Sequence, residues 1–390
     1  MLASELRIAL FSGNYNYVRD GANQALNRLV GYLERQGATV RVYAPTTDTP
    51  AFPPTGTLVS IPSFKLPFGG RGEYRVGKGL NRAIRADLEA FAPNIVHISA
   101  PDIVGHRAVS WARRRGIPAV ASVHTRFETY FRYYNMAWAQ VAAEALLRRL
   151  YFRCIEIYAP SESMAAVLTD QRMSRRVAIW SRGIDREQFN PGRRDMAWRR
   201  SLGIADDEVV ILFVARLVLE KGLDILAATL AELTERGVPH RALVVGDGPA
   251  RAWIEERAPS AIFTGFLGGT DLARAFASAD LMFNPSSTET FGNVTLEAMA
   301  SGLPVVAARA TGSLSLVEEG VSGLLTTPDD IEGSADALAQ LIGDPAFRLS
   351  ASQAGLARAA RYDWDAINDQ LLQRYLRVSE LWDRRKRIKR

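Results

Sequence analysis

Hydrophobic and polar positions alternate along the chain between short apolar runs and longer amphipathic segments. The first cycle is LRIALFS followed by GANQALNRLVGYLERQG, in which Ala25, Leu29 and Leu33 recur at helical spacing. The apolar runs are nearly continuous, which is typical of parallel strands that helices cover on both faces. The predicted strands of the first half are residues 6–12, 38–44, 94–99, 117–124 and 155–161.

A break in this alternation divides the chain. Residues 181–194, SRGIDREQFNPGRR, combine two glycines, a proline and many charges, and they predict a linker. The alternation then restarts, which predicts a second doubly wound α/β domain after the first. The predicted strands of the second half are residues 209–215, 241–246, 261–265, 280–286 and 303–308.

The end of the chain predicts one long amphipathic helix over residues 364–382. A helix with one apolar stripe buries that stripe, so we expect it to pack on a domain. We therefore assign residues 1–185 together with 364–390 to the first domain, and residues 186–363 to the second. The apolar positions at helical spacing are Ile367, Leu371, Tyr375 and Val378.

Composition narrows the class of protein. With 390 residues, 47% hydrophobic and 23% charged, the chain suits a soluble protein with two cores. Cys154 is the single cysteine, so no internal disulfide forms, which fits a reducing cytosol. The N-terminus predicts a buried strand and no signal peptide, and no run of about 18 apolar residues predicts a membrane span. Residues 47–56 and 62–79, rich in Pro or Gly, predict surface loops.

The net charge of +6 hides an asymmetry. Residues 1–190 carry 25 Lys and Arg against 15 Asp and Glu, a net +10. Residues 191–383 carry 17 against 27, a net −10, and the tail RRKRIKR adds +6. A basic first half and a basic tail predict an anionic partner, either a membrane surface or a nucleic acid. A solvated basic face without a partner is the alternative.

Two cations follow the first strand of the second domain. Parallel sheets bind ligands beyond the carboxyl ends of their strands, so residues at strand exits are the candidates for a site. Arg216 and Lys221, five positions apart at such an exit, are suited to a diphosphate. The alternative is two ordinary surface cations.

The segment NPSSTETFGNVTLEAMASG follows strand 280–286. We expect a helix to begin near residues 291–293, with its first N–H groups and its dipole favouring an anion. Gly292 permits close approach of a phosphate. Glu289 precedes the helix and Glu297 lies about one turn inside it. Because a phosphate repels carboxylates, we expect ribose or sugar hydroxyls as their partners, and two solvated acids are the alternative.

Other motifs are weaker. VVGDGPAR contains a lone G-x-G, and no full G-x-G-x-x-G or P-loop occurs, so a nicotinamide cofactor is poorly supported. His97, His106 and His240 lack metal-ligand spacing. The aspartates of Asp363-Trp364-Asp365 open the last predicted helix, where a cap is the plainer interpretation. We assign no metal and no cofactor.

The first domain offers two candidate positions. Asp20 and Gly21 join the first strand to the first helix, where Asp20 caps the helix and Gly21 permits close approach of a ligand. His124 ends strand 117–124, which places a histidine at a strand exit. A histidine at such a position is also common as a satisfied polar residue without a ligand.

Several of these motifs, in this order, resemble family 4 of the retaining glycosyltransferases. ETFGNVTLEAMASGLPVVA resembles the E-x7-E signature of that family, and so do ARLVLEKGLDIL, VGDGPAR, the TGF at residues 264–266 and SRGIDREQFNP. The resemblance covers essentially the whole chain. It implies the GT-B fold: two Rossmann-like domains facing across a cleft, with the last helix crossing back to the first domain.

The resemblance also implies roles for individual residues. Arg216 and Lys221 hold the donor diphosphate, Glu289 binds hydroxyls of the transferred sugar, and His124 lies near that sugar. These four form the expected catalytic group. For the donor, the resemblance implies that Glu297 binds the ribose, that the backbone at the start of the helix meets the sugar and phosphates, and that other residues lie beside the base or phosphates. The full set of implied donor-binding residues is Gly21, Gly246, Phe266, Leu267, Thr290, Phe291, Gly292, Asn293, Val294 and Glu297.

Within the family, RDGANQALNRLVGYLERQG, NIVHISAPDIVGHRAV and SVHTRFETYFRYY resemble a narrower branch with sulfoquinovosyl-, glucuronosyl- and mannosyl-transferring members that glycosylate lipids. This implies a lipid acceptor such as diacylglycerol and a peripheral location on the cytosolic membrane face. We favour a UDP-sugar donor, with an acidic sugar such as glucuronate included, and GDP-mannose or a soluble acceptor as alternatives. Cations and aromatics at 126–138, continued by Arg148, Arg149 and Arg153, suit a membrane interface or an aromatic core face.

Two other classes have less support in the sequence, and we expect no nucleic-acid partner. A basic nucleic-acid-binding protein would show a steeply salt-dependent affinity for duplexes, but the sequence has no helix-turn-helix, zinc finger or RNA-recognition signature. A non-hydrolysing sugar-nucleotide epimerase shares the fold, and it would convert the donor with no acceptor present.

Overall fold

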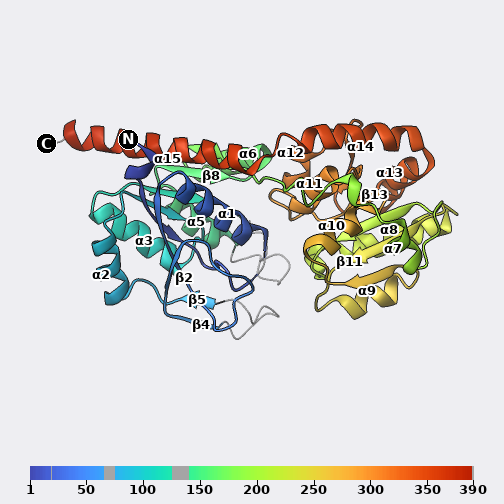
Figure 1. Ribbon diagram of the computed structural model, residues 1–390, viewed down its shortest axis with the longest axis horizontal. Helices are drawn as coiled ribbons and strands as arrows, with labels where there is room; N and C mark the ends of the chain where they lie inside the picture. Colours follow the sequence, from blue (N-terminus) through green and yellow to red (C-terminus); the bar gives the residue numbers. More distant parts are fainter. Residues whose placement is uncertain (19, 66–74, 125–139, 389–390) are drawn as a thin grey trace. The chain divides into compact units, whose positions relative to one another are not determined.

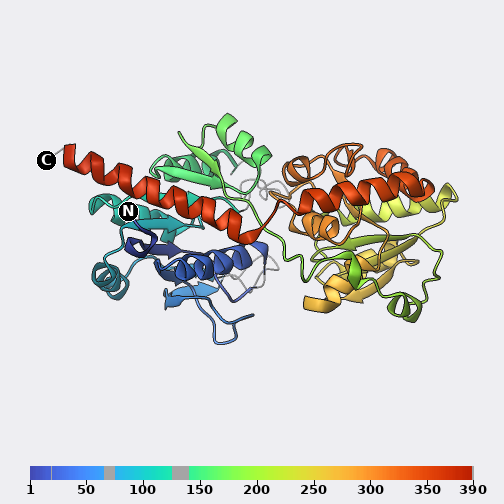
Figure 2. The ribbon, with the colours of Figure 1, turned by 45° about the horizontal axis from the view of Figure 1, so that its top comes forward.

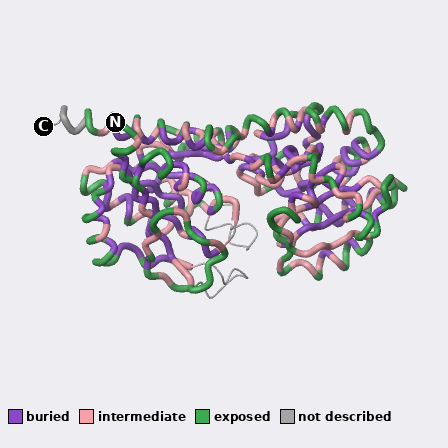
Figure 3. The backbone as a smooth tube through the Cα atoms, viewed as in Figure 1, coloured by how far each residue is buried: buried purple, intermediate pink, exposed green. Residues whose placement is uncertain are grey.

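The computed structural model describes residues 1–18, 20–65, 75–124 and 140–388, with the backbone alone described from residue 385 onward. The chain forms two compact units, Met1–Arg182 with Trp364–Arg390, and Gly183–Asp363. Each unit has its own parallel sheet covered by helices (Figure 1). The buried positions follow the strands of both sheets, as the purple segments in Figure 3 show.

The first unit contains a seven-stranded parallel sheet in the order β3-β2-β1-β6-β7-β8-β9. The interior strand β1 pairs with β2 on one side and β6 on the other, so that Ile8 lies opposite Val40 and Ile95. The strands are β1 Arg7–Phe11, β2 Thr39–Ala44, β3 Thr57–Ser60, β6 Ile95–Ile98, β7 Ala119–Ser122, β8 Glu156–Ala159 and β9 Val177–Ile179. The helices are η1 Ala3–Glu5, α1 Gly21–Arg35, α2 Arg82–Phe91, α3 Ile103–Arg114, α5 Gln140–Tyr151, α6 Glu162–Asp170 and α15 Trp364–Ile388.

The C-terminal helix α15 belongs to the first unit. Its four apolar positions Ile367, Leu371, Tyr375 and Val378 are all buried. It packs beside α1, where the Tyr32 hydroxyl donates to Asp369 and Arg35 forms an ion pair with Asp365 at 2.7 Å (Figures 1 and 2). The helix therefore completes the core of a unit whose other elements lie almost two hundred residues earlier.

The prediction of a continuous loop over residues 62–79 is wrong at both of its ends. Strand β4 Ser63–Lys65 pairs antiparallel with β5 Arg75–Gly77, with Phe64 opposite Val76. The sequence signal is weak because each strand has only three residues. The pairing is supported by packing, since a Cβ on Gly77 would lie 2.4 Å from Val104 Cγ2 on α3.

The second unit contains a six-stranded parallel sheet in the order β12-β11-β10-β13-β14-β15. Five of these strands match the predicted runs, whereas β15 was not predicted because only two of its four residues, Leu324 and Leu325, are apolar and they follow a glycine. The strands are β10 Val210–Val214, β11 Arg241–Val245, β12 Ile262–Gly265, β13 Leu281–Asn284, β14 Val305–Ala308 and β15 Gly323–Thr326. The helices are η3 Pro191–Arg193, α7 Met196–Ser201, η4 Leu219–Lys221, α8 Leu223–Glu235, α9 Arg251–Arg257, α10 Gly269–Ala277, α11 Asn293–Ala300, α12 Thr311–Leu316, α13 Ile331–Gly343 and α14 Pro345–Ala359.

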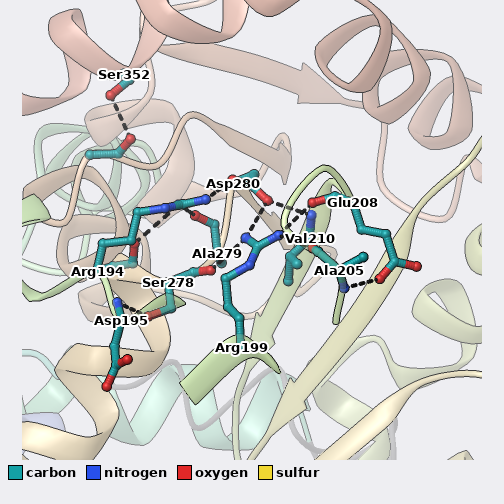
Figure 4. A network of polar contacts seen from close by, with 12 residues as sticks. Arg194, Asp195, Arg199, Ala205, Glu208, Val210, Ser278, Ala279, Asp280 and Ser352 are labelled. Atoms are coloured by element: carbon teal, nitrogen blue, oxygen red, sulfur yellow. Dashed lines mark hydrogen bonds and ion pairs between the residues drawn. The ribbon is translucent and has the colours of Figure 1, made fainter. Parts of the chain in front are cut away.

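A buried ion-pair network holds the amino end of this sheet (Figure 4). Asp280, just before β13, accepts from Arg199 at 2.9 Å, from Arg194 at 2.7 Å and from the Val210 amide at 2.8 Å. Arg199 is almost fully buried and also donates to the carbonyls of Ser278 and Glu208. The network thus fixes α7 and the starts of β10 and β13, at the edge of the sheet opposite to the strand exits.

Candidate functional site

The sheet of the second unit changes direction between β10 and β13. These two strands are neighbours, but the chain continues from β10 to one side of the sheet and from β13 to the other. The loops that follow them therefore diverge at the carboxyl ends of the two strands, and such a topological switch point is the usual ligand position in open α/β sheets. Arg216 and Lys221 follow β10, and the Glu289–Glu297 segment follows β13.

The structure brings Lys221 and Glu289 together. Lys221 Nζ donates to Glu289 Oε1 at 2.6 Å, and both side chains are partly buried. Lys221 ends the short helix η4, and Arg216, two residues after β10, is exposed. Thr288 Oγ1 donates to the Glu220 carbonyl at 3.3 Å, which ties the two loops to each other.

Helix α11, which follows β13, presents an uncapped N-terminus at this switch point. Its N-cap is Gly292, which has φ +90° and supplies no side-chain cap. The first-turn amides of Asn293 and Val294 have no hydrogen-bond partner among the residues that the structure describes. A left-handed N-cap is accessible to glycine at little cost, and it leaves the helix N–H groups open to an anion.

Glu297 is a half-buried acid one turn into α11. It shares a helix face with Asn293, four positions earlier, and its carboxyl forms no hydrogen bond or ion pair with any described residue. Burial raises the pKa of its carboxyl to about 8. An acid held without a partner in this way is suited to hydroxyl groups of a ligand.

Phe291 contributes its backbone and not its ring. The ring lies in the core of the unit, where it meets Tyr362 edge-on at 5.9 Å. The loop before it is held by α12, since the Gly312 amide and Thr311 Oγ1 both donate to the Glu289 carbonyl, at 2.8 and 2.6 Å. Sequence reasoning missed Thr311 and Gly312, although a TG turn after a strand was a signal that could have indicated them.

The glycine turn after β11 has a packing role. A Cβ on Gly246 would lie 1.9 Å from the Ala215 carbonyl oxygen, and one on Gly248 would lie 2.4 Å from that of Leu217. The Leu217 amide also donates to the Asp247 carbonyl. The turn therefore lets the exits of β10 and β11 approach closely, which positions the segment that carries Arg216.

Phe266 and Leu267 follow β12. The Phe266 side chain is 71% exposed, which is unusual for a large aromatic residue, whereas Leu267 packs partly against the core. An exposed ring at a strand exit offers a flat apolar surface for stacking.

In the first unit, Gly21 is the first residue of α1, and the Asp20 side chain caps this helix by accepting from the Asn23 amide at 2.8 Å. The loop before it is held by buried asparagines, with Asn27 Nδ2 donating to the Tyr15 carbonyl and Asn23 Nδ2 to that of Val18. In the second unit, Thr290 in the loop before α11 and Val294 in the first turn of α11 are both partly buried.

His124 lies half-buried two residues after β7. Its Nε2 is 2.8 Å from Ser122 Oγ, and its Nδ1 is 2.8 Å from a guanidinium nitrogen of Arg182. Burial, followed by the nearby charges of Arg182 and His97, holds the pKa of the ring well below its usual range. The imidazole is therefore neutral at physiological pH, and sequence reasoning had not connected it with Arg182.

The interfacial aromatics at 126–138 lie outside the described residues, as do the side chains of residues 385–390 in the basic tail. Within the described part of the chain, no group of three or more His, Cys, Asp or Glu is arranged to hold a metal ion. No described helix is long and apolar enough to cross a bilayer.

Two family models match the chain. One, "Glycosyltransferase Family 4", matches residues 19–188, and the other, "Glycosyl transferases group 1", matches residues 208–344. The two matches correspond closely to the two units of the structure.

Among curated proteins, the chain is 30% identical to a GDP-mannose-dependent alpha-mannosyltransferase of Corynebacterium glutamicum, over 97% of this chain and 91% of that protein. It is also 30% identical to the sulfoquinovosyl transferase SQD2 of Arabidopsis thaliana, over 99% of this chain and 76% of that protein. Among solved structures, the sucrose-phosphate synthase of Thermosynechococcus elongatus aligns with a TM-score of 0.79 and 21% identity, over 96% and 99% of the two chains. That last likeness concerns the fold alone.

Proposed function

The chain belongs to glycosyltransferase family 4, has the GT-B fold and depends on a nucleotide-sugar donor, and on this premise we propose that it transfers a hexose to a membrane lipid with retention of anomeric configuration. We assign the donor to the second unit and the acceptor to the first.

One observation carries the donor assignment: Lys221 and Glu289 pair at 2.6 Å beside the uncapped N-terminus of α11. The lysine and the helix amides are suited to the diphosphate, and Arg216 adds a second cation at the same strand exit. Glu289 is suited to hydroxyls of the sugar, and its pairing with Lys221 sets the carboxylate next to the phosphate position without repelling it.

Two further contacts complete the proposed donor site. Glu297 accepts hydrogen bonds from the ribose hydroxyls, because its carboxyl has no partner among the described residues. Phe266 stacks on the base, since its ring is exposed directly after β12.

The chemical step needs little from the protein beyond charge stabilisation. The bond from the anomeric carbon to the phosphate oxygen breaks, and the diphosphate leaves with the electron pair. The acceptor hydroxyl attacks the same face, and its proton passes to the departing phosphate oxygen. Arg216, Lys221 and the α11 amides stabilise the charge on the leaving group, as preorganised donors do in a fixed site.

The sequence motifs favoured a UDP-sugar donor, but we now favour GDP-mannose, because the C. glutamicum relative named for that donor matches almost the full length of both chains. UDP-sugars, including acidic ones, are the second candidate, on the resemblance of the motifs to the lipid-glycosylating branch. Stacking on Phe266 accommodates either base.

For the acceptor, we favour a lipid because of a surface on the first unit, the α5–α3 surface. Arg113, Arg114 and Arg149 are exposed there, and none of them forms an ion pair with a described residue. Burial and then the charges of Arg113, Arg149 and Arg114 lower the pKa of Arg153, so these cations lie close together.

Exposed apolar side chains accompany these cations. On α5, Val141 is 75% exposed and Leu146 is 52% exposed, and Phe152 follows at 45%. Positive charge beside exposed apolar groups is typical of a surface that binds anionic lipids.

The test is mass spectrometry of products from a panel of GDP- and UDP-sugars, with diacylglycerol-containing liposomes in one arm and soluble sugars in the other. We expect a glycolipid whose anomeric configuration matches the donor. A glycosylated soluble sugar without glycolipid would replace the lipid acceptor with a soluble one. Conversion of the donor with no acceptor present would indicate an epimerase and overturn the proposal.

A further inference from the structure

A chain of buried hydrogen bonds runs through the first unit to His124. The Tyr375 hydroxyl on α15 lies 2.6 Å from His97 Nδ1, and His97 Nε2 lies 2.9 Å from Ser122 Oγ. Ser122 Oγ in turn lies 2.8 Å from His124 Nε2. Arg182 closes the chain at His124 Nδ1, 2.8 Å away.

Arg182 sets the direction of the first two bonds. A guanidinium only donates, so His124 Nδ1 accepts. The neutral ring then carries its proton on Nε2 and donates to Ser122 Oγ. Ser122 is left with its own hydroxyl proton to donate to His97 Nε2, and His97 Nδ1–H donates to Tyr375.

The surroundings hold this order in place. His97 is fully buried, and burial lowers the pKa of its ring to about 3, so it does not charge at physiological pH. Both histidine rings meet Trp180 edge-on, at 5.7 Å for His124 and 6.1 Å for His97. The Trp180 indole donates to Asn368 on α15.

Arg182 is itself held independently of any carboxylate. It is 4% exposed, donates to the carbonyls of Trp180 and Ser181 at 3.0 Å, and lies over the Trp180 ring at 4.8 Å. No described carboxylate pairs with it. Burying a cation costs free energy unless its N–H groups form hydrogen bonds. One of the Arg182 N–H groups donates to His124 Nδ1 and so orients the ring.

We propose that this chain, from Tyr375 to Arg182, positions the His124 imidazole at the exit of β7 as its neutral Nε2–H tautomer. Both ring nitrogens are occupied, so His124 acts through a fixed ring and backbone and not through proton transfer. The positioning residues are Ser122, His97, Tyr375 and Arg182. The link to turnover rests on the proposed function, whereas the tautomer does not.

The direct test is NMR of the full chain labelled with ¹⁵N in the histidine rings. The sequence has four histidines, so the ring signals can be assigned by single substitutions. We expect His124 to be neutral at pH 7 with its proton on Nε2. A charged His124 ring or an Nδ1–H tautomer would overturn the proposal, whether or not the protein is a glycosyltransferase.

The variants test the connection. Ser122→Ala removes the hydroxyl that bridges His97 and His124. We expect a change in the His124 signals and a loss of about five- to tenfold in kcat/KM. Arg182→Met removes the donor at Nδ1, and we expect the Nδ1–H tautomer to appear. If that buried substitution prevents folding, Ser122→Ala and Tyr375→Phe carry the test.

Tyr32→Phe is the matched control for Tyr375→Phe. Its hydroxyl also bonds to α15, through Asp369 at 3.1 Å, but it lies outside the chain to His124. We expect Tyr375→Phe to shift the His97 and His124 signals and lower kcat/KM, and Tyr32→Phe to do neither. Equal effects of the two variants, or unchanged ring signals in Ser122→Ala, would show that the chain does not position His124.

Discussion

At the scale of single residues, the ion pair of Lys221 with Glu289 is the feature that turns two loops into one site. The two side chains are 68 positions apart in the sequence and 2.6 Å apart in the structure. Both side chains are partly exposed to solvent, so the ion pair adds little to the free energy of unfolding. We infer that its role is to place opposite charges side by side. Substitutions there should affect turnover far more than folding.

We expect Lys221→Ala to lower kcat/KM about a hundredfold, because a preorganised donor at a developing anion is lost. Glu289→Gln should lower it by roughly tenfold or more, since a charged acceptor of sugar hydroxyls becomes neutral. The losses should be non-additive in the double variant, because the two residues are in contact. Steady-state kinetics with a saturating acceptor measures this.

Lys78→Ala, an exposed lysine in the first unit, is the control and should leave the rate unchanged. Circular dichroism should show all of these variants folded. A near-normal rate in Lys221→Ala would remove Lys221 from the donor site.

Glu297 predicts a pH dependence of stability. Burial raises the pKa of its carboxyl from 4.5 to about 8, so between these values the folded chain binds a proton that the unfolded chain has released. The contribution of Glu297 to the free energy of unfolding therefore falls as pH rises from 4.5 to about 8, and it is constant above that pH. We expect Glu297→Gln to be more stable than the parent protein at pH 8.5 and equal to it near pH 4.5, by urea unfolding at each pH.

The same group should affect the donor. If ribose hydroxyls bind the ionised carboxylate, donor affinity should rise by roughly tenfold between pH 7 and pH 8.5. Isothermal titration calorimetry with GDP-mannose measures this, and Glu297→Gln should flatten the profile. A flat profile in the parent protein would contradict the ribose assignment.

At the scale of elements, the two edges of the second sheet have separate tasks. The carboxyl edge carries the loops of the proposed donor site, and the amino edge carries the network of Asp280 with Arg199 and Arg194 (Figure 4). Helix α11 begins at the carboxyl edge, where its first amides have no partner among the described residues. Helix α7 is held at the amino edge by the bond from Arg199 to Asp280. Stability and activity should therefore respond to different substitutions.

We expect Asp280→Asn to lower the free energy of unfolding by about 3 kcal/mol, because the buried Arg199 loses its counter-charge. Activity per folded molecule should be unchanged. The matched control is Asp206→Asn, whose partner Arg200 is the next residue of α7 but whose pair is exposed. Chemical denaturation should show no change for that control, and equal losses in the two variants would contradict this account.

At the scale of the whole molecule, charge is divided along the chain. The first 190 residues have a net charge of +10 and residues 191–383 a net charge of −10. Within the first unit, the α5–α3 surface gathers exposed cations beside exposed apolar groups. A lipid-binding face in the unit that we assign to the acceptor would keep the anionic donor and the anionic membrane on different surfaces.

We expect Arg113→Gln with Arg114→Gln to weaken binding to vesicles rich in phosphatidylglycerol by about thirtyfold, at roughly 1 kcal/mol for each cation. Co-sedimentation at physiological salt measures this. Arg82→Gln with Arg85→Gln on α2 removes the same charge elsewhere in the unit and should have a much smaller effect. If both pairs weaken binding equally, net charge and not this surface is responsible.

Much of the architecture follows from local pattern. Continuous apolar runs predicted nearly all long strands, and the spacing of Ile367, Leu371, Tyr375 and Val378 predicted α15 and its buried stripe. The start of α11 at Asn293 lies within the predicted interval. These features depend on periodicity over a few residues, which a single sequence contains. The short strands β3, β4, β5, β9 and β15 were missed, because three or four residues carry too little periodicity to predict pairing.

By itself, the sequence determined the succession of the longer strands and helices, the division into two α/β units, and the residue types at the strand exits. Only the tertiary structure decided which exits adjoin, because strand order depends on packing between distant segments and not on local pattern. That is why Lys221 meets Glu289 across 68 positions and Tyr375 meets His97 across 278. It also separated Phe291, whose ring belongs to the core, from Phe266, whose ring is exposed, since burial is a property of the folded surroundings.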